Sequence, residues 1–99
     1  DKLLQHVADA IDRLQKEMNR MFSYNMCFGL YVHVCCLIER LVTREGEEDY
    51  VKRYEECSRE LQEFILCIKM AFEKVEKYYS VSIPIEEIEY ISIYIRSMH

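Results

Sequence analysis

The segment YVHVCCLIERL, residues 31–41, contains two side chains that could take part in chemistry, His33 and Arg40. On a helix with about 100° of rotation per residue, the apolar residues of this region fill roughly half of the circumference. His33 falls just outside them, on the side that also carries Gly29, Arg40 and Arg44. We therefore expect its ring at the rim of the core, facing a shallow dent that solvent reaches.

A rim imidazole has a specific chemical use. Its neutral ring can accept a phosphoryl group on a nitrogen, provided that a lone pair is free and the donor approaches in line. Gly29 would leave the approach open, and the guanidinium groups of Arg40 and Arg44 would match the phosphoryl oxygens. The same residues also fit a histidine that makes only structural hydrogen bonds, with Arg40 paired to Glu39 or Glu47.

Four segments with helical periodicity must position these side chains. We expect helices over residues 2–22, 26–44 and 49–79, and a last helix that opens at Pro84 after an extended link at 81–83. The first carries a stripe of Leu4, Val7, Ile11, Leu14, Met18 and Met21. The second should be the most buried, with a core arc of Cys27, Phe28, Leu30, Tyr31, Val34, Cys35, Leu37, Ile38, Leu41 and Val42. The last buries Ile85, Ile88, Ile91 or Ser92, and Ile95.

Three further residues bear on these elements. Gly46 suits the turn that ends the second helix. Cys57-Ser58 is the weakest point of the long third segment, although periodicity alone predicts one helix there. His6 lies off the stripe of the first helix, so we expect it to be solvated.

Composition limits the class of protein. Ninety-nine residues that are 51% apolar are enough for one domain, residues 1–99, and two glycines and one proline favour helices with short links over a sheet. The net charge of −5 disfavours nucleic-acid binding. No apolar stretch approaches the ~20 residues of a membrane span, so we expect no membrane contact either. Because the first residue is not methionine, we expect a fragment of a longer protein.

The five cysteines occur at positions 27, 35, 36, 57 and 67, and none forms a CxxC motif. An odd number of thiols without such a motif is typical of reduced cysteines in a cytosolic protein rather than of a disulfide framework.

Two stretches resemble a known family. HVCCLIERL places His33 and Arg40 seven residues apart in an apolar helix, and YYSVSIPIEEIEYISIYI has Ile-Pro followed by Glu-Ile and then Tyr-Ile. Together they resemble the PTS regulation domain (PRD) of bacterial transcription regulators that the sugar phosphotransferase system (PTS) controls. The resemblance runs from about Leu30 to the end. The stretches ERL and EKYYSVSIP are most similar to the LevR/ManR branch of sigma-54-dependent activators, with the BglG/LicT antiterminators as the sister branch.

The resemblance implies a dimerising bundle of five helices, in which the long third segment breaks near 56–60. It implies that HPr or an EIIB protein phosphorylates His33, and that Arg40 and Glu87 match the arginine and the acidic residue of the family. Tyr94 stands where many members have a second histidine, so this chain would have one phosphorylation site or none. Phosphorylation would change dimer packing and tune the transcription of sugar-uptake genes in a bacterial cytoplasm, without a cofactor.

Three other functions fit parts of the sequence. The stripe of the first helix could serve a helical dimerisation or scaffold module in which His33 accepts no phosphoryl group. His33 and Cys36 are spaced like two metal ligands, but a structural zinc site needs four, so we expect no metal. The carboxylates of EEIE and EGEED resemble helix-start and loop charges rather than a paired acid and base, so we expect no enzyme activity of this domain.

Overall fold

The computed structural model describes residues 2–43 and 49–97, which are all-helical, as the sequence predicts. Arg44 and Gly46 lie outside the described residues. Within them the chain forms six helices: α1 (Lys2–Glu17), α2 (Tyr24–Val42), α3 (Tyr50–Glu56), α4 (Arg59–Ala71), α5 (Glu73–Tyr79) and α6 (Ile85–Ser97).

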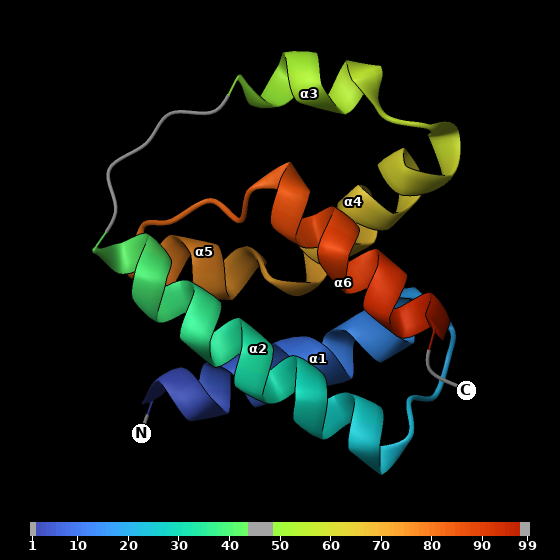
Figure 1. Cartoon of the computed structure of the whole chain (residues 1–99). Helices are drawn as coiled ribbons and strands as arrows, with labels where there is room; N and C mark the ends of the chain where they lie inside the picture. Colours follow the sequence, from blue (N-terminus) through green and yellow to red (C-terminus); the bar gives the residue numbers. More distant parts are fainter. Residues whose placement is uncertain (1, 44–48, 98–99) are drawn as a thin grey trace.

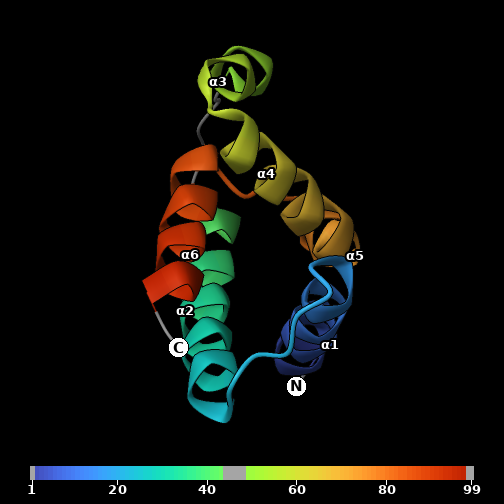
Figure 2. The same ribbon diagram turned by 90° about the vertical axis from the view of Figure 1, so that its right-hand side faces the viewer.

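The helices form two layers (Figure 1). Figure 2 shows α2 and α6 side by side in one layer, with α1, α4 and α5 in the other. Helix α1 packs against α2, α4 and α5, and α4 also packs against α6, so the apolar core lies between the layers. Helix α3 lies at one end of the bundle, next to the start of α6.

Helix α6 buries the stripe that its sequence predicts. Its buried side chains are Ile85, Ile88, Ile91, Ser92 and Ile95. Full burial of an isoleucine side chain stabilises the fold by about 1.5–3 kcal/mol relative to exposure. Burial of this stripe therefore fixes the orientation of α6 about its own axis. That rotation decides which α6 side chains face α2.

Helix α1 ends earlier than its apolar stripe predicts. Asn19 adopts a left-handed conformation with φ of 51°, and the amides of Asn19 and Arg20 donate to the carbonyls of Lys16 and Gln15 at 3.1 and 2.9 Å. This pattern is a Schellman motif, which stops a helix. Met21 therefore lies outside α1 and is 93% exposed, so its assignment to the stripe is wrong.

Helix α2 begins where Ser23 caps it, because the Ser23 Oγ atom accepts a hydrogen bond from the Met26 amide at 3.2 Å. The sequence predicts that α2 is the most buried helix, and this prediction is wrong. Within the described residues, no helix lies over the outer side of α2. Phe28 and Val42, both expected in the core, are 58% and 54% exposed. The buried side chains of α2 are Met26, Leu30, Val34, Cys35, Leu37 and Ile38.

By length and composition alone, α2 is apolar enough to cross a membrane. The expectation that no stretch approaches this limit is therefore wrong. A core helix passes the same test, and six α2 side chains lie in the core of this bundle.

The long third segment breaks twice. The break at Cys57-Ser58 agrees with the expected position near 56–60, and Ser58 caps α4 by accepting a hydrogen bond from the Leu61 amide at 3.2 Å. The second break, at Phe72, separates α4 from α5 and raises the count from the expected five helices to six. Phe72 departs from helical geometry with φ of −102° and ψ of 12°, and its side chain is buried. Neither Gly nor Pro marks this break.

A polar cluster holds the link between α5 and α6. The Glu76 carboxylate accepts hydrogen bonds from Lys69 Nζ at 2.6 Å and from the Ile83 amide at 2.8 Å. Lys69 also donates to Ser82 Oγ at 3.1 Å and lies 4.5 Å from the centre of the Tyr50 ring. This Lys69–Glu76 cluster joins α3, α4, α5 and the link, and thereby fixes where α6 begins.

The sequence predicts that His6 is solvated, but in the structure His6 packs on α5. Its ring centre lies 4.6 Å from that of Tyr78 and 5.9 Å from that of Tyr79, and its Nδ1 atom is 3.4 Å from the Tyr79 hydroxyl. The apolar stripe of α1 does not predict this contact, because α5 covers a second side of α1.

Candidate functional site

The candidate site lies along the boundary between α2 and α6, which run in opposite directions. Three pairs of residues meet across this boundary. They are Gly29 with Tyr94, His33 with Tyr90, and Arg40 with Glu87. The order of the pairs shows that residues of α2 meet residues progressively earlier in α6.

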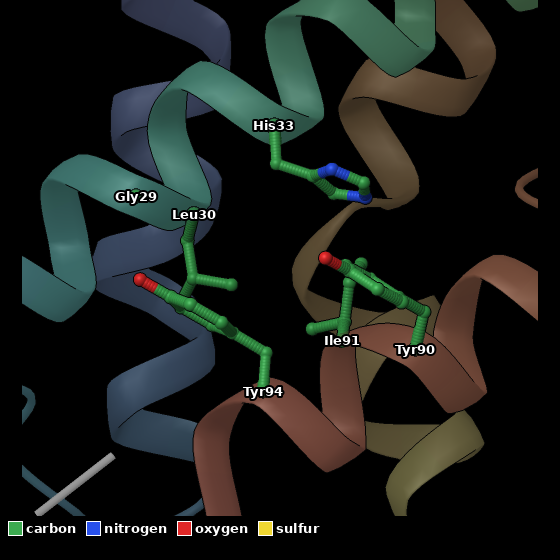
Figure 3. Close-up of a pocket in the computed structure, with 6 residues that line it drawn as sticks. All are labelled: Gly29, Leu30, His33, Tyr90, Ile91 and Tyr94. Atoms are coloured by element: carbon green, nitrogen blue, oxygen red, sulfur yellow. The ribbon is translucent and has the colours of Figure 1, made fainter. Parts of the chain in front are cut away.

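His33 lies on the wall of a pocket of about 110 Å³ at this boundary. Figure 3 shows the six lining residues, which come only from α2 and α6: Gly29, Leu30, His33, Tyr90, Ile91 and Tyr94. The histidine is half-buried, so it lies at the rim of the core, as the helical geometry predicts.

The imidazole of His33 stacks on the Tyr90 ring, with 5.0 Å between ring centres and 30° between ring planes. Its Nε2 atom is enclosed and has no hydrogen-bond partner within the described chain. An enclosed polar atom without a partner costs about 1–3 kcal/mol. Within the described residues, His33 therefore has a stacking contact but no hydrogen bond at this nitrogen.

Gly29 makes room for Tyr94. The phenol of Tyr94 reaches across to α2, and a Cβ atom at position 29 would collide with the Tyr94 hydroxyl. The space that the glycine leaves is therefore filled by an aromatic side chain, where the sequence predicts an open approach to His33. Tyr94 thus closes one end of the pocket.

Arg40 forms an ion pair with Glu87 across the two helices, with 3.9 Å between Nη2 and Oε1. The Arg40 side chain is 60% exposed, so the pair contributes little to stability. The other carboxylate oxygen, Oε2, is enclosed and has no partner among residues 2–43 and 49–97. The sequence singles out both residues but expects Glu39 or Glu47 as the partner of Arg40.

The cysteines and acidic residues near the site do not form a metal centre. In the described ranges no group of three or more His, Cys, Asp and Glu side chains could hold a metal ion. Cys36, one turn after His33, is exposed, whereas Cys35 is buried. Burial, and secondarily the nearby Cys36 and Glu39, raise the pKa of the Cys35 thiol, which favours its neutral form.

Residues 8–98 of the chain match the PRD domain family. The chain belongs to the PRD family. No curated protein and no solved structure matches it significantly. PRDs are PTS regulation domains of transcription regulators, and PTS components generally phosphorylate them.

The fold of this PRD places the four positions that the resemblance singles out along one boundary, with His33 and Tyr94 at the pocket and Arg40 paired with Glu87 beyond it. Sequence analysis missed Tyr90, which stacks on His33. The motif IEEIEYISIYI contains it one turn before Tyr94, but its contact with His33 follows only from the register of α6 against α2. Spacing within one helix carries no information about that register.

Proposed function

We propose that this PRD is a phosphorylation-controlled regulatory domain of a bacterial transcription regulator, and that a PTS protein phosphorylates His33. The proposal depends on one observation. The histidine that matches the family motif lies at a pocket boundary, and its imidazole has no hydrogen-bond partner in the described part of the chain, which supports a chemical use of the ring.

The finer parts of the proposal follow from the residues quoted for the resemblance. HPr, an EIIB protein or both would be the phosphoryl donor, and the ERL and EKYYSVSIP stretches favour the LevR/ManR branch. The domain would belong to a longer regulator in the bacterial cytoplasm that controls sugar-uptake genes. It would act as a phosphoryl acceptor and not as an enzyme, and the output would come from ATPase or DNA-binding parts elsewhere in that protein.

The switch would act through charge. A phosphoryl group adds about two negative charges at neutral pH, on a chain whose net charge is already −5. The surface beside the pocket is partly apolar, because Val32, Tyr90 and Ile93 are 44%, 56% and 52% exposed. We propose that two copies pair through this surface and that a charge on His33 changes the pairing. Arg40 and Arg44 would attract the phosphoryl group, and Gly29 would support the site by accommodating Tyr94.

The decisive experiment is phosphoryl transfer in vitro. The protein is incubated with enzyme I, HPr, phosphoenolpyruvate and an EIIB protein, and phosphohistidine is located by mass spectrometry under alkaline conditions. We expect label on His33 and its loss in His33→Ala. His6→Ala is the matched control, because His6 packs against α5 and not in the pocket.

A scaffold module remains the second candidate, and one observation favours it. Tyr24, Phe28 and Val32 follow one another at every fourth residue of α2 and are 82%, 58% and 44% exposed, and the first two line a groove beside α1. Such a stripe suits association with another helix. If the donor set leaves His33 unlabelled and His33→Ala associates like the wild type in sedimentation, the scaffold function is correct.

A further inference from the structure

The two ring nitrogens of His33 lie in different surroundings. Nε2 is enclosed, as described above. Nδ1 is neither enclosed nor hydrogen-bonded to any residue that the structure describes. Solvent therefore reaches only one of the two atoms that could accept a phosphoryl group.

Tyr90 is the α6 side chain that lies flat against the imidazole (Figure 3). Leu30 and Ile91 line the pocket behind the two rings. Tyr90 is itself 56% exposed, so it forms an outer wall of the site rather than part of the core. In Figure 3 the outer ring nitrogen, Nε2, lies on the side of the imidazole toward Tyr90, whereas none of the side chains drawn there lies beside Nδ1.

Phosphoryl transfer to a histidine needs an open line to a nitrogen lone pair. We propose that Nδ1 of His33 is the acceptor atom and that Tyr90 is the positioning residue that enforces this choice by covering Nε2. The inference rests on the proposed phosphorylation of His33. It adds which atom reacts and which neighbour decides it.

The transfer balances as follows. His33 carries its hydrogen on Nε2, and the Nδ1 lone pair forms the new bond to phosphorus. The bond from phosphorus to the donor's histidine nitrogen or cysteine sulfur breaks, and its electron pair leaves with the donor atom. The Nε2 hydrogen stays on the ring during the step, so the enclosed nitrogen takes no part in bond making.

The test is the isomer of phosphohistidine that forms. Protein labelled with 15N is phosphorylated by the PTS donor set, and separately by potassium phosphoramidate, which transfers its phosphoryl group and releases ammonia. Ring-nitrogen NMR then distinguishes the two isomers. We expect the Nδ1 isomer to predominate over the Nε2 isomer in the wild type.

Three variants separate a positioning role of Tyr90 from a structural one. Tyr90→Ala should raise the Nε2 share several-fold, whereas Tyr90→Phe should restore the wild-type ratio because it keeps the covering ring. Tyr78→Ala is the control, since Tyr78 is a similarly exposed tyrosine, 54%, on α5. It should leave the ratio unchanged. Circular dichroism confirms that each variant folds.

The outcomes distinguish this inference from the proposed function. Label on His33 mainly at Nε2 in the wild type, or an isomer ratio that Tyr90→Ala does not change, overturns the assignment and leaves the proposed function standing. No label from the PTS donors, together with Nδ1 label from phosphoramidate that depends on Tyr90, overturns the function and supports the assignment.

Discussion

At the scale of single residues, the contact between Gly29 and Tyr94 makes two positions depend on each other. Replacing a glycine inside a helix by alanine gains about 1 kcal/mol of stability when the new methyl group fits. At position 29 the methyl group would displace the Tyr94 hydroxyl. We expect Gly29→Ala to stabilise the protein by about 1 kcal/mol in a Tyr94→Ala background and to give no gain, or a loss, when Tyr94 is present.

Urea unfolding of the four proteins in this double-mutant cycle measures the coupling. Equal stabilisation by Gly29→Ala in both backgrounds would show that the phenol moves aside at no cost, and that the two positions are independent.

The sequence predicts the position of His33 on its own helix but not its neighbours. Rotation by a fixed angle per residue places the imidazole at the rim, and the structure confirms it. The partners Tyr90 and Tyr94 come from a helix more than fifty residues later in the chain. Which of its side chains meet α2 depends on burial of the isoleucine stripe and on where α6 begins.

At the scale of elements, the Lys69–Glu76 cluster sets the start of α6 and is the most shielded ion pair among the described residues. The Lys69 and Glu76 side chains are 26% and 14% exposed. Glu76→Ala leaves the ammonium group and the Ile83 amide without their shared acceptor. We expect a loss of about 2 kcal/mol in the free energy of unfolding.

Glu73→Ala is the matched control on the same helix. Glu73 pairs with Lys77 at 3.7 Å, but both side chains are more than half exposed, so the loss should stay within about 0.5 kcal/mol. Denaturant melts compare the two variants. Equal losses would contradict a special role for the cluster.

The ends of the elements were predictable only where a residue type marks them. Ser58 is a common helix cap, and the break beside it lies where the family resemblance implies one. The break at Phe72 carries no turn residue, and its buried ring continues the apolar pattern of the segment. Apolar periodicity runs through such a break unchanged.

At the scale of the whole molecule, three buried or half-buried thiols make stability depend on pH. Burial, and secondarily nearby acidic groups or a neighbouring thiol, raises the pKa of Cys27, Cys35 and Cys67. A group whose pKa is higher in the folded state holds its proton more tightly there. Its contribution is therefore fully present below the ordinary thiol pKa of about 8.5 and is lost as the pH rises through the folded value.

We thus expect the free energy of unfolding to fall as the pH rises above about 8.5. Guanidinium melts at several pH values measure the slope. Cys35→Ala should flatten it, and Cys36→Ala, which changes an exposed thiol, should not. A slope that is the same in all three proteins would assign the effect to other groups.

The fold class was predictable for a reason that belongs to the whole chain. The chain has few glycines and prolines, half of its residues are apolar, and the apolar residues keep helical spacing throughout. Together these features favour a helical bundle over the other fold classes. The layering was not predictable, because an apolar helix such as α2 gives no indication of which of its sides remains uncovered.

The high hydropathy of α2 also has a consequence during translation. The α4 and α6 segments, which complete the core that α2 enters, end at Ala71 and Ser97. At about 5–20 residues per second, the ribosome adds the 55 residues between Val42 and Ser97 in roughly 3–11 s. Until α4 is made, the nascent chain presents an apolar nineteen-residue segment, and α1 is the described helix already available to pack against it.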